Sequence, residues 1–588
     1  MSASSRRLPF GANLIASGRT HFRIWAPAQG SLSVAIAGRQ PLPMKRNADG
    51  WFDVEANCTA GTRYRYMLQD GTRVPDPAAR AQAGDVHGDS IVVDPAAYRW
   101  RQTEWRGRPW HDAVTYELHV GLLGGFAGVA RELRRIAELG FTAIELMPIA
   151  EFPGARNWGY DGVLPFAPES SYGSPDELKA LIDAAHALGL MIFLDVVYNH
   201  FGPDGNYLHL YAPQMFRHDI ATPWGAALDF RRREVRRFFT ENALYWLIEY
   251  RFDGLRFDAV HAISDPDWLD QMAAEVRRTV APGRHVHLVL ENDDNTASHL
   301  AGEFDAQWND DGHHVLHVLL TGEHEGYYAD YADAPAARLA RCLRDGFIYQ
   351  GEPSAYRDGK RRGTASAQLP PTAFVLFLQN HDQIGNRAFG ERLTSLTCPQ
   401  ALEAAIALQL LCPQMPLVFM GEEEASRSPF LFFTDHNAEL AQAVRDGRRR
   451  EFARFAYFSD PRHLAKIPDP NALETFEQSR PLPHPPEAER RANLYRHLLE
   501  LRRSEIVPRL DGARALDASA VGPAAVLARW RMGDGAILTL ASNFAAEPAA
   551  LPAQAQRLLF GSSESAARAV RVGRLEPYTT VALLASDG

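Results

Sequence analysis

The 588-residue sequence lacks long hydrophobic runs, an extended basic block and glycine-rich phosphate loops. No segment approaches the roughly 20 apolar residues of a membrane-spanning helix, so we expect no membrane partner. The formal net charge is −10 without a block of Lys or Arg, which argues against nucleic acid as the main partner. The missing glycine-rich turn also removes the usual mark of an open, doubly wound nucleotide-binding sheet.

Cysteine is scarce and scattered along the chain. The four residues are Cys58, Cys342, Cys398 and Cys412. They lack the paired spacing of zinc ligands, and the first 30 residues contain no continuous apolar core of a secretory signal. We therefore expect reduced, mostly buried thiols in a cytoplasmic protein.

Both ends of the chain are predicted to be rich in β-strands. Residues 1–105 alternate short apolar segments with turn residues, as in THFRIWAP, SLSVAIAG and GWFDVEA, which predicts a small β-sandwich. Residues 98–110, YRWRQTEWRGRPW, are a predicted linker whose tryptophans pack against the next domain. Short strand-like segments return at 525–544 and 578–586 and predict a compact antiparallel β domain over residues 489–588.

The middle of the chain, residues 106–488, alternates apolar strand-like runs with helical stretches, which is typical of a parallel sheet covered by helices. The runs lie at residues 113–121, 141–150, 190–200, 253–261, 286–293, 306–310, 373–382 and 416–423. About eight such strands close a (β/α)8 TIM-type barrel, which we predict as the central domain. An open doubly wound sheet is the alternative, although no glycine-rich phosphate turn supports it.

Polar residues gather at the carboxyl ends of these runs, where the loops of a parallel barrel share one pocket. They are Asp195, Asn199, His200, Arg256, Asp258, His261, Glu291, His381 and Asp382. Asp258 and Glu291 follow successive strands, close enough to flank one bond as the carboxyl groups of a glycosidase do. Arg256 points to the same side of its strand as Asp258 and is expected to keep that carboxylate ionised. The negative neighbours of Glu291 favour its protonated form, which a general acid needs.

Two other interpretations of these residues remain. His and Asp at strand ends also suit a divalent metal, although Arg256 would repel a cation and no HxH or HxxxH cluster occurs there. A single carboxylate such as Asp195 could also serve only as a structural ion-pair partner, whereas carboxylates at four strand ends favour a functional pocket. Asp253, beside Gly254, is predicted to be a turn or capping residue.

Four motifs in fixed order resemble those of the α-amylase superfamily, glycoside hydrolase family 13. They are DVVYNH, GLRFDAVH, LEND and LQNHD, after the third, fourth, fifth and seventh predicted strands. The resemblance covers about residues 110–480 and implies an immunoglobulin-like sandwich of the glucan-enzyme type before the barrel. It also implies that Asp258 is the nucleophile, Glu291 the acid/base and Asp382 the residue that grips sugar hydroxyls in a retaining reaction.

The resemblance further implies a glucan-binding pocket. We assign it no cofactor and no metal ligand, while a structural calcium ion, for which Asn199 resembles a ligand of some amylases, stays open. The residues expected to bind substrate are Tyr160, Asp161, His200, Trp224, Arg256, His261, Asn292, Asp293, Asn380, His381 and Gln383. Sugar faces need aromatic platforms, which Trp158, Tyr160 and Trp224 offer, although each is equally suited to core packing.

Longer phrases are most similar to one hydrolytic group of the family. They are WGYDGVLPFAPESSYG, TPWGAALDF and FFTDHNAELAQAVRDGRRREF. This similarity implies hydrolysis of the α-1,4 bond next to the terminal trehalose of maltooligosyltrehalose, with water as second substrate and a synthase of that substrate as functional companion. Glycogen branching enzyme, an α-1,6 debranching hydrolase and a non-catalytic glucan-binding protein are the alternatives. One departure from the resemblance is Glu424, at a position where an aromatic or small residue is expected. Glu422 and Glu423 either contact substrate or cap the barrel, and we favour the cap.

Overall fold

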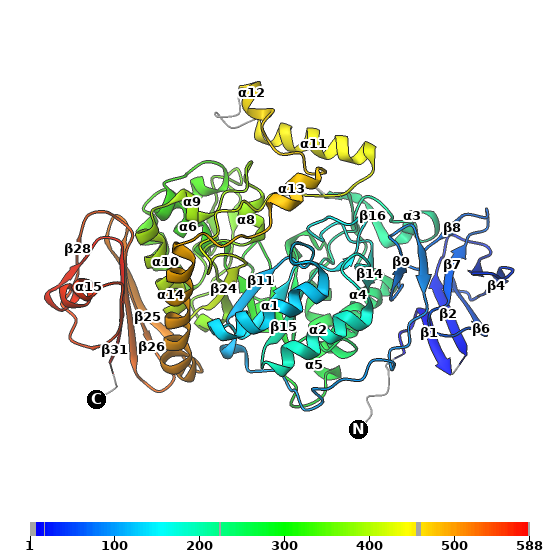
Figure 1. Cartoon of the computed structure of the whole chain (residues 1–588), viewed down its shortest axis with the longest axis horizontal. Coiled ribbons are helices and arrows are strands. Elements are labelled where there is room, and N and C mark those ends of the chain that lie inside the picture. The colour runs from blue at the N-terminus through cyan, green and yellow to red at the C-terminus, as the bar shows by residue number, and fades with distance from the viewer. Residues whose placement is uncertain (1–6, 17, 223–224, 454–459, 586–588) are drawn as a thin grey trace.

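The computed structural model describes residues 7–16, 18–222, 225–453 and 460–585. Two β-rich parts lie at opposite ends of a central barrel (Figure 1). The predicted fold class, a (β/α)8 barrel between a β-sandwich and an antiparallel β domain, is confirmed. Among the described helices, none combines the length and apolar character needed to cross a lipid bilayer.

The N-terminal part is a sandwich of two antiparallel sheets. The first sheet has the order β1 (Gly11–Ala16), β2 (Arg19–Trp25), β6 (Trp51–Ala56) and β5 (Lys45–Arg46). The second has the order β4 (Leu42–Pro43), β3 (Ser33–Ile36), β7 (Arg63–Met67), β10 (Asp89–Ile91) and β9 (Gln82–Ala83), with β8 (Arg73–Val74) beside β7. Alternate residues of β2, including Phe22 and Ile24, are buried, because successive side chains point to opposite faces of a sheet.

The barrel closes with eight parallel strands; seven lie inside a predicted run, and β24 begins one residue before the run predicted at 416–423. Their order is β11 (Thr115–Leu118), β12 (Ala143–Leu146), β15 (Met191–Val196), β18 (Gly254–Phe257), β19 (His287–Leu290), β20 (Ala306–Trp308), β23 (Phe374–Leu376) and β24 (Met415–Phe419). Every strand residue is buried on both faces, which explains why the runs are almost continuously apolar.

Helices cover the outside of the barrel. They are α1 (Gly125–Leu139), α2 (Pro175–Ala187), α4 (Arg233–Ile248), α5 (Asp267–Thr279), α6 (Asp310–Thr321), α7 (Pro335–Asp345) and α10 (Pro399–Leu411). Helix α2 shows how the sequence sets such an element: Ser174 caps its start with Glu177 in a capping box, and Pro175 opens its first turn. Helix α14 (Glu487–Leu501) packs against α1 and α10 and leads to the C-terminal part.

The connections after the barrel strands carry further elements. These include β13 (Ala150–Glu151), β14 (Leu164–Pro168), α3 (Leu208–Tyr211), β16 (Phe216–Thr222), β17 (Gly225–Leu228), α8 (His381–Gly385), α9 (Leu393–Leu396), α11 (Ala438–Phe452), α12 (Pro461–Leu464) and α13 (Leu473–Gln478). The longest connection within the barrel, residues 309–373, holds α6, a 3-10 helix at Gly326–Tyr331, α7 and a hairpin of β21 (Glu352–Pro353) and β22 (Arg361–Arg362). We call residues 309–373 the β20–β23 segment.

The C-terminal part is an antiparallel sheet, as predicted. Its order is β25 (Arg514–Gly522), β26 (Ala525–Arg531), β27 (Ile537–Asn543), β31 (Thr579–Ala585) and β29 (Arg557–Gly561), with β28 (Ala549–Ala550) and β30 (Arg574–Leu575) as a separate pair. The Thr580 hydroxyl donates to the Ala404 carbonyl at 2.7 Å and ties this sheet to α10. The four cysteines are free and mostly buried, as expected.

Tryptophans of the predicted linker close the amino-terminal end of the barrel, as the sequence predicted. The Trp105 indole donates to Asp253 Oδ1 at 2.8 Å, and the Trp110 indole donates to the Thr372 carbonyl at 2.8 Å. Asp253 is not the local turn residue that its position beside Gly254 suggested. It is fully buried and also binds His186 Nε2 at 2.9 Å and the Ile192 N–H at 3.0 Å.

Replacing Asp253 by alanine is expected to destabilise the barrel by about 3 kcal/mol, because the buried donors of Trp105, His186 and Ile192 lose their acceptor. Urea denaturation of the variant measures the loss. Asp70→Ala is the matched control, since Asp70 is exposed and accepts only from the Thr72 N–H in a turn. Equal losses in the two variants would contradict the role of Asp253.

Candidate active site

A cavity of about 500 Å³ opens at the carboxyl ends of the barrel strands. The side chains of Asp258, directly after β18, Glu291, directly after β19, and Asp382, in α8, all line it. We call it the central cavity. Its walls come from the barrel on one side and from the β20–β23 segment on the other, so two distant parts of the sequence build one site.

Arg256 joins three carboxylates from three neighbouring strands. Its Nη1 donates to Asp195 Oδ2 at 2.6 Å and to Asp258 Oδ1 at 3.0 Å, and its Nη2 donates to Glu291 Oε2 at 2.7 Å. The guanidinium also lies over the Trp308 ring, 4.0 Å from its centroid. Asp258 and Glu291 therefore cannot be farther apart than two hydrogen bonds and the width of one guanidinium, which places both within reach of one sugar.

The pKa values of three carboxyl groups in or beside the central cavity are raised. Burial raises the pKa of Glu291, and Asp258 adds to this effect while Arg256 opposes it. The predicted direction for Glu291 is therefore correct, but burial rather than negative charge is the larger cause. Burial also raises the pKa of Asp195 to about 7 and raises that of Asp382.

Asp258 is held by neutral donors as well as by Arg256. The Asn199 amide donates to Asp258 Oδ2 at 2.8 Å and to its carbonyl at 2.9 Å. Because these donors fix the plane of the carboxylate, the oxygen that faces the cavity has a set direction. Such pre-orientation is what an attacking group needs.

Tyr160 and His381 extend the hydrogen-bonded group around Arg256 beyond Asp195. The Tyr160 hydroxyl donates to Asp195 Oδ2 at 2.6 Å and lies 2.8 Å from His381 Nε2. His381 Nδ1 binds Glu117 on β11. Burial works against a charged imidazole, but Glu117 outweighs it, so the pKa of His381 is raised. The sequence analysis did not single out Glu117, although it lies in the first predicted strand.

Most residues expected to bind substrate line the central cavity. Those that do are Tyr160, His200, Arg256, His261, Asp293, His381 and Gln383, together with Trp158. The side chains of three others accept hydrogen bonds from nearby protein groups instead. Asp161 accepts from the Asn157 amide, Asn292 accepts from the Asp294 N–H, and Asn380 caps α8 by accepting from the Asp382 N–H. Trp224 lies outside the described residues.

The three glutamates after β24 lie away from the central cavity. Glu422 accepts from the Phe419 N–H at 2.8 Å, and Glu423 accepts from the Tyr116 hydroxyl at 2.8 Å. Arg135 on α1 binds both Glu423, at 2.7 Å, and Glu424, at 3.5 Å. These contacts close the end of β24 against α1, which agrees with the predicted capping role of Glu422 and Glu423.

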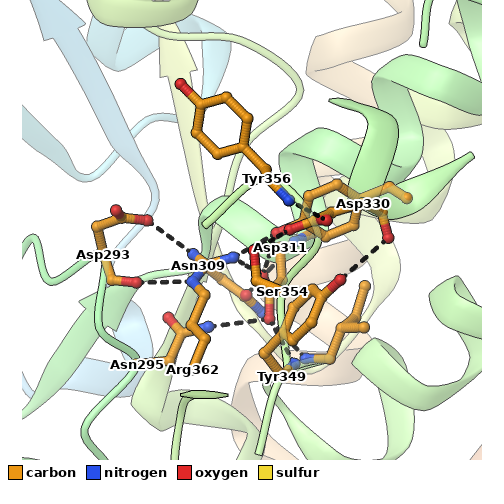
Figure 2. Close-up of polar contacts among 12 residues, drawn as sticks. Asp293, Asn295, Asn309, Asp311, Asp330, Tyr349, Ser354, Tyr356 and Arg362 are labelled. Carbon is orange, nitrogen blue, oxygen red and sulfur yellow. Dashed lines mark hydrogen bonds and ion pairs between the residues drawn. The ribbon is translucent and has the colours of Figure 1, made fainter. Parts of the chain in front are cut away.

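A buried network fixes the second wall of the cavity (Figure 2). Asp311 on α6 accepts from Arg362 Nη1 at 2.9 Å, the Tyr331 hydroxyl at 2.5 Å, the Asn295 amide at 2.9 Å, and the N–H groups of Ile348 and Tyr349 at 2.7 and 3.0 Å. Arg362 Nη2 donates to Asp293 Oδ1 at 3.0 Å. We call these residues the Asp311 network.

The same wall is fixed at its outer side by Asp330. Its carboxylate accepts from the Ser354 hydroxyl and from the Tyr356 N–H at 3.0 Å, and its carbonyl accepts from the Tyr349 hydroxyl at 3.2 Å (Figure 2). The hairpin that carries Tyr356 is therefore tied to the segment by several hydrogen bonds. The sequence analysis missed this wall, because no short motif marks it.

The residues described by the structure contain no group of three or more His, Cys, Asp or Glu side chains arranged to hold a metal ion. His381, one histidine of the central cavity, binds a protein group instead, the Glu117 carboxylate. Chemically, the site offers one carboxylate held by Arg256 and Asn199, one carboxyl group with a raised pKa, and sugar-sized space between them.

Comparison with protein families and relatives gives a consistent result. The family described as alpha amylase, catalytic domain, matches residues 85–218, and a domain of unknown function, DUF3459, matches residues 513–582. Malto-oligosyltrehalose trehalohydrolase of Deinococcus radiodurans is 42% identical and covers 85% of this chain and 82% of that protein. The protein of the same name from Saccharolobus solfataricus is 41% identical and covers 76% and 80%.

A more distant relative and a solved structure complete the comparison. A 1,4-alpha-glucan branching enzyme of Corynebacterium jeikeium is 33% identical over 44% of this chain and 41% of that protein. A crystal structure from Salmonella typhimurium, provisionally described as an alpha amylase, has a TM-score of 0.92 at 44% identity. It covers 99% of this chain and 100% of that chain.

Replacing Arg362 by methionine is expected to destabilise the protein by about 3 kcal/mol, because Asp311 loses its buried charged partner. Chemical denaturation measures the loss, and limited proteolysis reports whether the hairpin at 352–362 opens first. Arg529→Met, which breaks the exposed pair with Asp517, is the matched control and is expected to cost less than about 1 kcal/mol. Similar costs for the two variants would disprove the network's role.

Proposed function

We propose that this chain, which belongs to the malto-oligosyltrehalose trehalohydrolases of the α-amylase family, hydrolyses the α-1,4-glucosidic bond next to the terminal trehalose of maltooligosyltrehalose. The products are trehalose and a maltooligosaccharide, as in trehalose biosynthesis. The observation that carries the proposal is Arg256, which holds Asp258 and Glu291 on one guanidinium in the central cavity. The names of the relatives that span most of the chain support the choice of substrate.

Asp258 is the nucleophile in this proposal. Its carboxylate attacks the anomeric carbon of the maltooligosyl part, and the bond from that carbon to the trehalose oxygen breaks. Arg256 and Asn199 keep the carboxylate oriented by hydrogen bonds to its two oxygens. The result is a covalent glycosyl-Asp258 intermediate, so the anomeric configuration is retained after the second step.

Glu291 supplies and recovers the proton. In the first step its carboxylic acid gives a proton to the departing trehalose oxygen. In the second its carboxylate takes a proton from the water that attacks the anomeric carbon, and the bond from that carbon to the Asp258 oxygen breaks, which frees the carboxylate. The raised pKa of Glu291, caused mainly by burial, favours the protonated form before the reaction. Water is the second substrate, and the proposal needs no cofactor.

Asp382 and the surrounding polar residues are proposed to bind the sugar that carries the anomeric carbon. Asp382 lines the cavity and forms hydrogen bonds with sugar hydroxyls, while Tyr160, His200 and His381 line the cavity around the same sugar. Tyr160 offers an aromatic face beside the reacting bond. The remaining expected residues, Asp161, Trp224, Arg256, His261, Asn292, Asp293, Asn380 and Gln383, stay predictions as substrate-binding residues.

The alternatives receive less support. The relative named as a branching enzyme covers less than half of this chain, whereas the named trehalohydrolases cover most of it. A non-catalytic glucan-binding protein needs neither a nucleophile nor a proton donor, yet Asp258, Glu291 and Asp382 are all present in one cavity.

The proposal includes the wider setting expected from the sequence. Its companion is a synthase that installs the terminal trehalose on a maltooligosaccharide, and its compartment is the cytoplasm. We also propose the domain limits 1–105, 106–488 and 489–588 for the sandwich, the barrel and the C-terminal domain. Neither nucleic acid nor a membrane takes part in the reaction.

Purified protein is expected to release trehalose from maltotriosyltrehalose, measured by chromatography of the products. The same protein incubated with amylose is expected to form no α-1,6 branches, as tested by iodine colour and by debranching. Hydrolysis and branching differ in the acceptor, water or a sugar hydroxyl, so the two assays separate them. Branches without release of trehalose would favour the branching enzyme.

Asp258→Asn and Glu291→Gln are each expected to lower kcat by about 1000-fold or more on the natural bond without unfolding the protein, because each removes one chemical step. On a maltotriosyl fluoride, whose leaving group needs no proton, Glu291→Gln is expected to form the glycosyl-enzyme much faster than Asp258→Asn. Mass spectrometry of the trapped intermediate measures this. Equal impairment of both variants on the fluoride would contradict the assigned roles.

The alkaline limb of kcat/KM is expected above pH 4.5, the ordinary value of a glutamate, because the raised pKa of Glu291 keeps its proton to higher pH. A pH profile on maltotriosyltrehalose measures the limb. On the fluoride, where the leaving group needs no proton, the glycosylation step is expected to lose this limb. If the limb stays unchanged in that step, it reports the titration of a group other than Glu291.

A further inference from the structure

Two polar side chains of the central cavity take no part in the mechanism above. Asp310 is the first residue of α6, directly after β20, and His314 follows one helical turn later on the same face. Both line the cavity. Their side chains are 9% and 8% exposed, so both groups are almost removed from bulk water.

Each of these two side chains has a polar group without a hydrogen-bond partner among the described residues. Within the described residues, His314 Nδ1 is buried without a hydrogen-bond partner. The Asp310 carboxyl makes no hydrogen bond or ion pair with these residues, but its oxygens are not among the fully buried unpaired atoms, so they stay open to the cavity. The rings nearest to the His314 imidazole are those of Tyr327, Tyr331, His313 and Tyr328, with centroids 4.7, 5.0, 5.3 and 5.5 Å away. Because buried polar groups are nearly always paired in native proteins, two such groups in one cavity point to a ligand.

Burial favours the neutral form of both groups. Burial raises the pKa of Asp310 well above its usual value, with Glu291 and Asp293 adding to the effect. Burial likewise lowers the pKa of His314 well below its usual value. A carboxylic acid and a neutral imidazole each offer one donor and one acceptor, which is the complement of sugar hydroxyls that both donate and accept.

Asp310 lies on the side of Glu291 that faces away from the nucleophile. It follows β20, which pairs with β19 ahead of Glu291, whereas Asp258 follows β18 on the other side of β19. Glu291 gives its proton to the leaving oxygen, so the departing sugar must lie beside Glu291. The Asp311 network holds this wall in place, since Asp311 is the next residue on α6.

We propose that Asp310 and His314 are specificity-determining residues that bind hydroxyls of the departing disaccharide and favour a terminal trehalose over a terminal maltose. This inference rests on the proposed function. A disaccharide whose second ring reaches both groups satisfies them, whereas one whose second ring is directed differently by its linkage leaves them buried and unpaired. Unpaired polar groups discriminate more strongly than missing apolar contacts.

The test compares maltotriosyltrehalose with maltopentaose, which has the same number of glucose units and loses maltose when it is cut at the same position. Asp310→Leu and His314→Phe are expected to lower kcat/KM on maltotriosyltrehalose by about 10–100-fold, the effect of losing one or two hydrogen bonds to a substrate. On maltopentaose kcat/KM is expected to change less than about threefold, within the range of a minor contact. The ratio of the two values therefore falls.

Two further variants separate recognition from folding. Asp310→Asn keeps a neutral group with a donor and an acceptor, so it is expected to retain most of the discrimination that Asp310→Leu loses. His313→Gln is the matched control. His313 is the neighbour of His314 on α6, is bound to the Leu378 carbonyl and the Tyr328 hydroxyl, and does not line the cavity. It is expected to lower the melting temperature but to leave the substrate ratio unchanged.

Two outcomes overturn the proposal: equal losses on both substrates, or no loss on either substrate. If the wild type releases no trehalose from maltotriosyltrehalose, the proposed function fails first. Calorimetric titration of wild type and Asp310→Leu with trehalose and with maltose then tests the sugar preference of Asp310 and His314 independently of hydrolysis. A preference for trehalose that the variant loses supports the assignment, and identical binding of both sugars by both proteins contradicts it.

Discussion

The site depends on one buried cation and the three carboxylates around it. Arg256 is almost fully buried, and a guanidinium in that position is tolerable only when hydrogen-bonded anions surround it. In return it fixes the distance between Asp258 and Glu291 and neutralises part of their repulsion. The barrel makes this possible, because β15, β18 and β19 are neighbours in register and end at the same rim.

The remaining architecture keeps this arrangement rigid and selective. The linker tryptophans and Asp253 close the opposite end of the barrel, while the Asp311 network fixes the wall that faces Glu291. The reacting bond thus lies between the barrel wall, which carries Asp258 and Glu291, and the wall built by the β20–β23 segment. Because the two walls come from separate stretches of sequence, the second can change specificity without disturbing the Arg256 cluster.

Parts of the fold and the site were predictable for identifiable reasons. All eight barrel strands were found, because strands buried on both faces form continuous apolar runs. Strands β1, β25 and β29 escaped notice, since edge and partly exposed strands carry weaker patterns. Asp258, Glu291 and Asp382 followed from their place after such strands, whereas Asn292 and Asn380, next to them in sequence, turn their amide oxygens toward local backbone.

The sequence by itself determined the barrel, its flanking β domains and the residues at the strand ends, because these follow from local periodicity and short motifs. Only the tertiary structure decided which side chains meet. Burial, rather than nearby charge, is the main cause of the raised pKa of Glu291, and burial is a property of the whole packed chain. The same holds for Asp310 and His314, whose lack of partners exists only after distant segments close around them.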